Sequence, residues 1–288
     1  MAVPSTSFDL VVASVDRTAE LRRLFGSLER QTHRDFRVVL VDQNDDDRLD
    51  AVARAHPDLR IVTVRAARGL SRARNAALGH LRGDVVAFPD DDCVYPADLL
   101  DRVARRLEEA PDVAGVTGRA VDEDGVSTPS WSADAARLTP TNLWNRAISY
   151  TIFLRRDLVA RTGEFDERLG LGAGTPSSSG EETDYLVRAV RLGGRIEYDP
   201  SLTVVHPARR YASDELSAIA TRDGTSLGYI LRKHRYPPHS VARLLVRPAL
   251  GAAVAVAQRD RERAAFQLRT LAGRVAGYRG ASSSKSSA

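Results

Sequence analysis

The 288-residue chain contains few cysteines, methionines, lysines and aromatic residues. It has one cysteine (Cys93), one methionine and two lysines (Lys233 and Lys285), and Phe, Trp and Tyr make up 6% of the residues. A single thiol excludes a disulfide-based fold and fits a reducing compartment. So few lysines limit chemistry that needs an amine. We expect Cys93 to be a small packing residue rather than a nucleophile.

Long apolar segments are lacking as well. The longest run of apolar residues without a charge covers residues 249–257, whereas a helix across a bilayer needs about 20 residues. The first seven residues show no basic stretch followed by an apolar one, so we expect no secretory signal there. These features predict a soluble, cytoplasmic protein.

The positive charge is confined to one part of the chain. The formal net charge is +4, but residues 232–279 hold eleven Lys or Arg against two acidic residues, whereas residues 1–231 hold 30 basic and 36 acidic residues. A nucleic-acid-binding domain carries its basic residues on the folded body, so we expect no nucleic-acid partner. Residues 240–279 interleave apolar stretches with arginines, as do helices that lie on an anionic membrane surface. Packing on the core with a solvated arginine face is the alternative.

The first 121 residues alternate between short apolar runs and amphipathic segments. Strands are predicted at Phe8–Ser14, Phe36–Asp42, 60–64, 84–88 and 113–117, and helices at 17–31, 49–55, 71–81 and 97–109. Continuous apolar strands that alternate with amphipathic helices are typical of a parallel sheet covered on both faces. The predicted fold class is therefore α/β.

The alternation stops after Val121. Residues 122–140 predict a long loop, 148–154 a strand, 170–180 a loop that is mobile or ordered by a ligand, 183–192 a helix and 195–206 one or two strands. From residue 214 the chain is expected to be helical, with interruptions at Pro237, Pro238 and Pro248. Residues 281–288 are expected to be disordered because their composition is of low complexity.

Three carboxylates, Asp90, Asp91 and Asp92, directly follow the fourth predicted strand. They repel one another unless positive charge lies among them, and hard oxygen ligands suit Mg²⁺ or Mn²⁺. In an open parallel sheet, ligands bind beyond the carboxyl ends of the strands, which is where this cluster falls. A solvated acidic turn that caps the helix at 97–109 is the alternative.

Polar residues also follow the first two predicted strands, at Ser14 to Arg17 and in the acidic run that begins at Asp42. Turn chemistry alone explains such residues equally well, because Asp, Asn and Ser favour loops and helix N-caps.

The helix at 71–81 opens with Arg72, Arg74 and Asn75. A helix N-terminus with basic residues is a natural site for an anion such as a diphosphate. A solvated arginine-rich face is the alternative.

A second acidic group, Glu181, Glu182 and Asp184, opens the helix at 183–192. One of these carboxylates could act as a general base, although Ser179 and Glu182 also have the spacing of a capping box. His206 ends the last predicted strand, either as a metal or phosphate contact or as an ordinary residue at a strand end.

Four segments together resemble the family 2 glycosyltransferases of the GT-A fold. They are VVASVDR with the helix after it and FRVVLVD, then GLSRARNAAL, then FPDDDCVYP, and finally GEFDERLGLGAGTPSSSGEETDYLVRA leading to YDPSLTVVHP. The resemblance implies a Rossmann-like GT-A fold with a mostly parallel central sheet. Residues 1–210 would form the nucleotide-sugar glycosyltransferase domain, 211–280 a helical basic amphipathic extension and 281–288 a tail.

The resemblance also implies an activity. It is a metal-dependent, inverting transfer of a sugar from a nucleoside-diphosphate donor to an acceptor hydroxyl, in cell-surface polysaccharide or glycolipid synthesis. The candidate donor contacts are Ser14, Arg17, Asp42, Arg72, Arg74, Asn75, Asp90 and Asp91. The candidate ligands of Mn²⁺ or Mg²⁺ are Asp92, Asp90 and His206, and the base would be Glu182, Glu181 or Asp184.

This chain departs from the family pattern at two positions. Glu182 stands where the family usually has an aspartate, which leaves the choice of base open. Arg68 replaces a common asparagine, so the contact of that asparagine is not carried over.

Two other functions fit parts of the sequence. Asp90, Asp92 and Val94 fit the aspartyl-nucleophile pattern of haloacid-dehalogenase-like phosphatases, which place it at their first strand and use a downstream lysine. A non-catalytic, basic membrane-surface binding module with a vestigial sugar-nucleotide domain is the second alternative. The expected partners are a nucleotide-sugar donor, a glycan or lipid-linked acceptor, and an anionic membrane surface at the inner face of the cell membrane, bound through residues 232–279.

Overall fold

The computed structural model describes residues 6–127, 130–208 and 211–280, and these form two compact units. The first unit comprises the described residues of Met1–Phe165 and Tyr185–Ala208, and the second those of Asp166–Asp184 and Arg209–Ala288. The segment 166–184, which was expected within one domain with the residues before it, therefore belongs by its contacts to the second unit. The tail at 281–288 lies outside the described residues.

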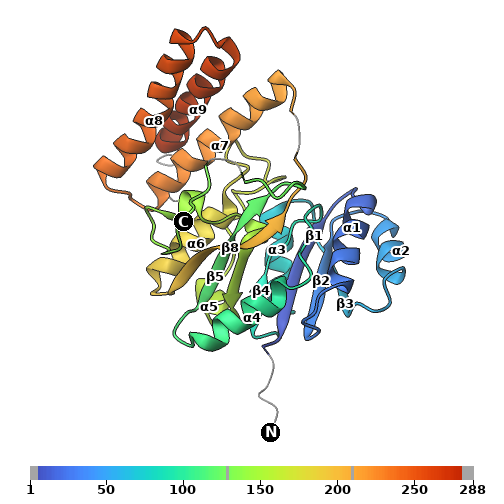
Figure 1. The fold of residues 1–288 in the computed structure, drawn as a ribbon. Coiled ribbons are helices and arrows are strands. Elements are labelled where there is room, and N and C mark those ends of the chain that lie inside the picture. Colours follow the sequence, from blue (N-terminus) through green and yellow to red (C-terminus); the bar gives the residue numbers. More distant parts are fainter. Residues whose placement is uncertain (1–5, 128–129, 209–210, 281–288) are drawn as a thin grey trace, which may run out of the picture. The chain divides into compact units, whose positions relative to one another are not determined.

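An eight-stranded, mostly parallel sheet forms the centre of the first unit (Figure 1). Its strands are β1 (Phe8–Ser14), β2 (Phe36–Asp42), β3 (Ile61–Arg65), β4 (Val85–Ala87), β5 (Gly115–Val121), β6 (Ala136–Arg137), β7 (Ile152–Arg155) and β8 (Ile196–Val205), in the order β3-β2-β1-β4-β7-β5-β8-β6. Strands β1 to β4 pair in parallel, as do β5 and β8, whereas β7 and β6 pair antiparallel to their neighbours. The sheet is thus two parallel blocks joined by one reversed strand, β7.

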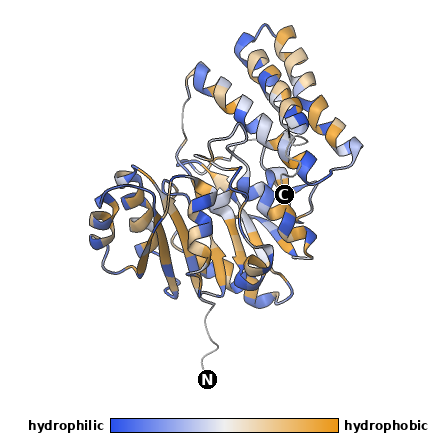
Figure 2. Cartoon of the chain, turned by 180° about the vertical axis from the view of Figure 1, so that it is seen from behind, coloured by the Kyte–Doolittle hydropathy of each residue, from blue (hydrophilic) through white to orange (hydrophobic). Residues whose placement is uncertain are grey.

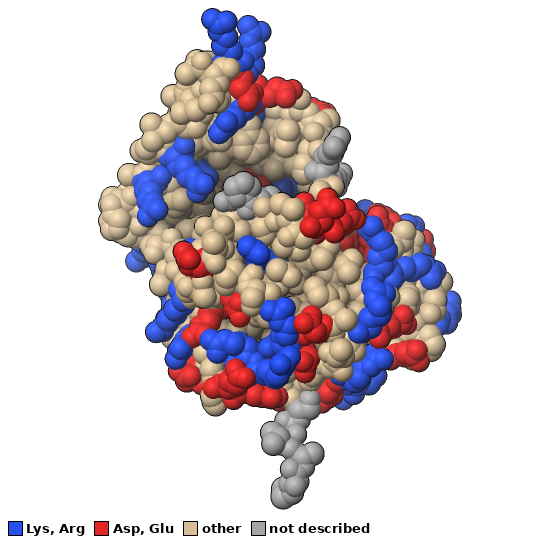
Figure 3. All heavy atoms as spheres, viewed as in Figure 1, with Lys and Arg blue, Asp and Glu red and all other residues tan. Residues whose placement is uncertain are grey.

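Helices cover both faces of this sheet because its strands carry apolar side chains on both sides. The helices of the first unit are α1 (Thr18–Glu29), α2 (Arg48–Arg54), α3 (Leu70–Leu78), α4 (Leu99–Glu109), α5 (Arg156–Thr162) and the larger part of α6 (Glu181–Arg191). Phe8, Leu10 and Val12 of β1 share one buried cluster with the apolar sides of α1, α2 and α4. In Figure 2 the strands are largely orange, whereas Figure 3 shows basic and acidic side chains interspersed over one face of this unit.

The predicted α/β class is confirmed, and two strands, Phe8–Ser14 and Phe36–Asp42, have the predicted bounds. Three elements were missed, one of them the 3₁₀ turn η1 (Leu143–Asn145). The predicted loop at 122–140 contains the two-residue strand β6, and α5 follows β7 with no glycine or proline between them. The strand predicted at 148–154 is a 3₁₀ turn, η2 (Ser149–Thr151), followed by β7.

Three helices make up most of the second unit: α7 (Ser213–Lys233), α8 (Pro238–Ala257) and α9 (Arg261–Gly280). Helices α7 and α9 pack through glycines, Gly224 and Gly228 on α7 and Gly273 and Gly277 on α9. A Cβ added at Gly224 would lie 2.6 Å from the carbonyl oxygen of Thr270. The two backbones are therefore too close for any larger side chain at this interface.

The expected interruption at Pro248 was wrong, because α8 continues through it. A proline inside a helix removes the N–H that would bond to the carbonyl four residues earlier, here that of Leu244. The side chain of Arg274 on α9 donates a hydrogen bond to that carbonyl. The neighbouring helix thus supplies the donor that Pro248 lacks. Pro238, in contrast, begins α8, a position that proline tolerates well.

Helix α8 is also long and apolar enough to cross a membrane by length and composition, alone among the helices in the described part of the chain. Its mean hydropathy is 1.5, and only 22% of the apolar window is buried. The helix contains no long uninterrupted apolar run, because Arg243 and Arg247 divide it.

The link between Arg274 and Leu244 predicts a coupling between two substitutions. Arg274→Met leaves the Leu244 carbonyl without a donor, whereas Pro248→Ala restores the backbone N–H. Arg274→Met should therefore destabilise the protein by about 1–2 kcal/mol less in the Pro248→Ala background than in the wild type. Urea unfolding followed by far-UV circular dichroism measures all four free energies. Equal effects of Arg274→Met in both backgrounds would contradict this role of Arg274.

Candidate functional site

Three neighbouring strands of the first unit end at the same edge of the sheet. Strands β2, β1 and β4 are adjacent and parallel, Ser14 pairs in register with Asp42, and Ala13 forms a bridge with Asp90. The structure therefore brings together the polar ends of three strands. This is the edge at which open parallel sheets bind ligands.

The middle carboxylate of the acidic run, Asp91, is buried. It accepts hydrogen bonds from Ser14 Oγ at 2.7 Å and from Arg17 Nη1 at 3.0 Å. Burial raises the pKa of Asp91 to about 6, and the Ser14 hydrogen bond and the Arg17 charge only partly offset this rise. Asp91 thus fixes the turn after β1 to the turn after β4.

The last carboxylate, Asp92, lies between the imidazole of His206 and the guanidinium of Arg17. Its Oδ1 is 3.2 Å from His206 Nε2, and its Oδ2 is 2.6 Å from Arg17 Nη1. Burial opposes ionisation of Asp92, but the hydrogen bond and charge of His206, together with Arg17, outweigh it and lower the pKa. The same hydrogen bond raises the pKa of His206. The imidazole is further held by stacking on Tyr150, with ring centroids 4.9 Å apart.

The first carboxylate, Asp90, contacts the side chains of Arg74 and Ser149. Arg74 Nη2 lies 3.4 Å and Ser149 Oγ 3.0 Å from Asp90 Oδ1. Arg74 is only 2% exposed, and its guanidinium lies over the rings of Phe88 and Phe165, 5.8 and 5.4 Å from their centroids. Aromatic faces of this kind stabilise a buried cation, so Arg74 supplies fixed positive charge beside Asp90.

Asp90, Asp92 and His206 could hold a metal ion. One ligand atom from each of them lies within 4.8 Å of the others. Two carboxylates and one imidazole are a donor set that suits Mn²⁺ and related divalent ions. The positive charge of Arg17 on Asp92 indicates that the cluster favours a cation.

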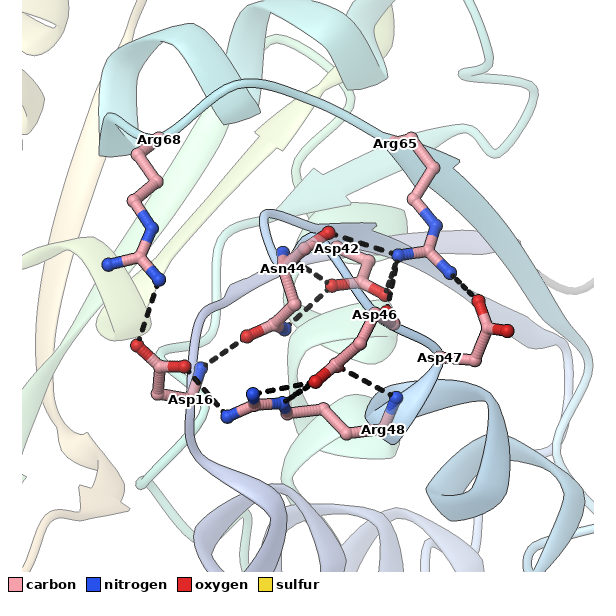
Figure 4. A network of polar contacts seen from close by, with 8 residues as sticks. All are labelled: Asp16, Asp42, Asn44, Asp46, Asp47, Arg48, Arg65 and Arg68. Atoms are coloured by element: carbon pink, nitrogen blue, oxygen red, sulfur yellow. Dashed lines mark hydrogen bonds and ion pairs between the residues drawn. The ribbon is translucent and has the colours of Figure 1, made fainter.

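The end of β2 presents a buried carboxylate, Asp42, that pairs with Arg65 but is only partly hydrogen-bonded. Asp42 is fully buried, and its Oδ1 accepts hydrogen bonds from the backbone N and the side-chain Nδ2 of Asn44, at 2.9 and 2.7 Å. Its Oδ2 lies 3.0 Å from Arg65 Nη1 but receives no hydrogen bond within the described residues (Figure 4). Buried acceptors without a hydrogen bond are uncommon, so Asp42 Oδ2 is suited to a ligand N–H.

A polar network joins the loops that follow β1, β2 and β3 (Figure 4). The backbone N–H of Asp16, a residue with φ 61°, donates to Asn44 Oδ1 at 2.8 Å. The Asp16 carboxylate pairs with Arg48 at 2.8 Å and with Arg68 at 3.1 Å. Arg68, which departs from the family pattern, thus pairs with the residue that precedes Arg17.

Helix α3 is fixed to this edge through its first residues. The N–H of Gly69, at φ 134°, donates to Gln43 Oε1 at 2.8 Å. Asn75 exchanges two hydrogen bonds with the backbone of Phe165, at 2.7 and 3.0 Å, and Arg72 donates to the carbonyl of Arg68. Arg72 thus holds the backbone just before α3, Asn75 joins α3 to the segment at Phe165, and Arg74 reaches the acidic cluster.

The three candidate bases begin α6 and belong to the second unit. Glu181 is 4% exposed, Glu182 is half-buried, and Asp184 is fully buried. Asp184 Oδ1 lies 2.6 Å from Lys233 Nζ and 2.7 Å from His234 Nε2. The three carboxylates therefore differ clearly in how much of their surface a reactant could reach.

Lys233 also binds Asp166, at 2.8 Å. Burial opposes ionisation of Asp166, but hydrogen bonds from Arg168 and Lys233 outweigh it and lower the pKa. The lysine is thus shared between two carboxylates of the second unit. The loop at 170–180 contains no helix or strand, and Ser179 within it donates to Ser226 Oγ on α7, at 2.9 Å.

Sequence reasoning missed four residues that contact the predicted site: Asn44, Arg65, Ser149 and Tyr150. Arg65 ends β3, so the rule about strand ends could have found it. Ser149 and Tyr150 lie in a turn before the reversed strand β7, where neither a motif nor a periodic pattern marks them.

Cys93 is fully buried, and burial raises the pKa of its thiol well above the usual range. Both observations agree with the expectation that Cys93 is a packing residue rather than a nucleophile.

Comparison with known proteins identifies relatives of this chain. The family model described as "Glycosyl transferase family 2" matches residues 9–161. The chain is 32% identical over 230 residues to the succinoglycan biosynthesis protein ExoO of Rhizobium meliloti, covering 72% of this chain and 62% of that protein. It is 30% identical over 143 residues to ExoM of the same organism, covering 48% of this chain and 44% of that protein. The matches thus span less than two thirds of these relatives' lengths.

Solved structures share the fold. The mannosyltransferase PcManGT of Pyrobaculum calidifontis, in complex with GDP-Man and Mn²⁺, matches with a TM-score of 0.65 and 20% identity over 96% of this chain and 88% of that one. Residues 1–349 of S. aureus TarS in complex with UDP-GlcNAc match with a TM-score of 0.57 and 18% identity, over 95% and 92% of the two chains.

The donor set predicts a measurable effect on metal binding. Asp92→Asn removes one negative charge from the ligand set, so the affinity for Mn²⁺ should fall by at least about tenfold. Titration of free Mn²⁺ by electron paramagnetic resonance measures this without any turnover. Asp98→Asn is the matched control, because Asp98 is an exposed aspartate six residues further on. An affinity of Asp92→Asn equal to that of the control would rule out Asp92 as a ligand.

Proposed function

The chain belongs to glycosyl transferase family 2, and from this premise we propose that it transfers a sugar from a nucleoside-diphosphate donor to an acceptor hydroxyl with inversion at the anomeric carbon. The observation that carries the proposal is the group formed by Asp90, Asp92 and His206 at the carboxyl end of β4. A nucleoside-diphosphate sugar needs a cation at its diphosphate, and this group is suited to hold one.

The donor would lie over the ends of β1, β2 and β4. Asp42 Oδ2, buried and without a hydrogen bond in the described residues, would accept one from an N–H of the nucleobase. Ser14 and Arg17 would border the same pocket, and Asp91 would hold both of them in place. Arg74 would add positive charge beside the diphosphate, and Asn75 and Arg72 would support α3 and the segment around Phe165.

A divalent cation held by Asp90, Asp92 and His206 would neutralise negative charge that develops on the diphosphate leaving group. The stack of His206 on Tyr150 orients the imidazole, and Ser149 orients Asp90. Arg17 pairs with Asp92, so this arginine would have to share the carboxylate when the cation is bound.

Glu182 is the proposed base. Asp184 is fully buried and held by Lys233 and His234, and Glu181 is nearly buried, so Glu182 is the carboxylate with most access to an acceptor. Its carboxylate would take the proton of the acceptor hydroxyl as the oxygen bonds to the anomeric carbon. The bond from that carbon to the diphosphate breaks on the opposite side, which inverts the configuration.

The proposed acceptor is a growing polysaccharide or a lipid-linked glycan. The names of ExoO and ExoM, succinoglycan biosynthesis proteins, support a role in polysaccharide synthesis. The excess of basic residues at 232–279 supports work at the inner face of an anionic cell membrane.

The phosphatase alternative has little support. Its aspartates would follow β4 rather than the first strand, and Lys233 is already bound to two carboxylates. A vestigial, non-catalytic domain is also disfavoured, because such a domain has no need to keep the metal-binding group together.

The assignment of the base predicts a specific kinetic defect. Glu182→Gln should lower kcat by about 10²–10⁴-fold and leave donor affinity unchanged, because the amide cannot take a proton. Initial rates of nucleoside-diphosphate release and equilibrium titration of the donor measure the two quantities. Glu167→Gln, an exposed position in the same unit, is the control. A normal kcat for Glu182→Gln together with a large loss for Glu181→Gln would transfer the role to Glu181.

The proposed donor class predicts ligand stabilisation. UDP-, GDP- and ADP-sugars with Mn²⁺ should be screened for a rise in Tm, and at least one should stabilise the wild type by the mass-action effect of binding. Asp42→Ala should abolish that rise while free Mn²⁺ still binds. The absence of stabilisation by every nucleotide sugar would argue against a catalytic role.

A further inference from the structure

In the second unit, helices α8 and α9 bury mostly small residues, whereas the last turns of α7 bury Ile230 and Leu231. The α7–α9 interface consists of glycines on both helices. The buried residues of α8 are Val241, Pro248, Ala252 and Ala255, and those of α9 are Ala264, Gly273 and Gly277. Helices in water usually bury their leucines and valines, whereas helices packed in lipid approach each other through small residues.

The large apolar side chains of α8 face outward. Val246, Leu250 and Val254 recur every four residues and thus share one side of the helix, and they are 49%, 62% and 47% exposed. Val256 is 64% exposed. The helix contains no acidic residue, and residues 248–257 contain no charge at all. Figure 2 shows long orange stretches in the helices of this unit. Such a continuous exposed apolar strip marks an interaction surface.

Arginines stand at both ends of this strip. Arg243 precedes Val246, Arg247 lies between Val246 and Leu250, and Arg259 follows the helix, with Arg261 and Arg263 just beyond. All five arginines are exposed. The nearest acids are Asp260 and Glu262, and Glu262 accepts a hydrogen bond from Ser213 at 2.5 Å. Figure 3 shows blue groups separated by tan surface on these helices. Apolar surface flanked by arginines complements a layer of anionic headgroups above acyl chains.

We propose that α8 lies along the surface of an anionic bilayer, with Leu250 and Val254 in the acyl boundary and Arg243, Arg247 and Arg259 at the lipid phosphates. The proposal names the helix through which the chain would bind the membrane, and it rests on the proposed function for its biological setting. The helix lies in the interface rather than spans it, because α9, which it packs against, carries charges along its whole length.

A second copy of the chain fits this surface poorly. In a symmetric pair of α8 helices, the arginines at one end would face the arginines at the other, since the helix offers no acid. Residues 232–279 carry nine more basic than acidic residues, so two such segments repel each other.

Vesicle flotation with the full chain tests the proposal. The wild type should float with phosphatidylcholine vesicles that contain about one third phosphatidylglycerol and remain at the bottom with phosphatidylcholine alone. The double variant Leu250→Gln/Val254→Gln should bind at least about tenfold more weakly, because two apolar side chains no longer enter the acyl boundary. Leu192→Gln is the matched control, since Leu192 is 49% exposed on the first unit.

Folding, salt dependence and oligomeric state are measured alongside flotation. Circular dichroism and Tm should be alike for all variants, because the substituted side chains are exposed. Arg243→Ser/Arg247→Ser should also weaken binding and reduce its dependence on salt. Equal flotation of Leu250→Gln/Val254→Gln and wild type would overturn the proposal, as would a lipid-free wild-type dimer that this variant converts to a monomer. Donor-dependent release of nucleoside diphosphate in solution is measured separately, so failure of the proposed function is distinguished from failure of membrane binding.

Discussion

The mutual repulsion of three adjacent carboxylates at the end of β4 is the constraint around which the first unit's site is arranged. Each carboxylate has its own set of partners: Asp91 has Ser14 and Arg17, Asp92 has Arg17 and His206, and Asp90 has Arg74 and Ser149. These partners come from the turns after β1 and before β7, from α3 and from the end of β8. The acidic run therefore fixes the positions of four segments that are far apart in the sequence, and a bound cation would add to an electrostatic balance that already exists.

The sequence allowed prediction of the parts of this arrangement that depend on local pattern. Continuous apolar runs gave β1 and β2 their bounds, and the rule about strand ends selected Ser14, Asp42 and Asp90. Ser149 and Tyr150 could not be found in this way. Ser149 contacts Asp90 across 59 positions of sequence, and that contact depends on a strand that enters the sheet in reverse, which no periodic pattern reveals.

Proline illustrates why local rules fail where tertiary contacts replace local ones. Pro248 predicts a break because the helix loses one hydrogen bond, yet the side chain of Arg274 supplies another donor to the same carbonyl. Burial and the nearby charge of Arg247 lower the pKa of Arg274 to about 10. Burial is thus unfavourable for the charged guanidinium of Arg274, and the hydrogen bond that it donates to the Leu244 carbonyl helps to hold it there. The second unit is held together by such specific contacts and by glycine packing, and the first by a cluster of large apolar side chains.

The pairing of Lys233 with Asp166 and Asp184 affects how the protein reacts with amine-directed reagents. With its ammonium group engaged by two carboxylates and its side chain 24% exposed, Lys233 is shielded from reagents that acylate amines. The sequence contains one other lysine, Lys285, while 40 arginines carry the remaining basic charge. Amine-directed labelling would therefore spare Lys233, and the arginines, which do not react with acylating reagents, would keep the charge pattern of both folded units.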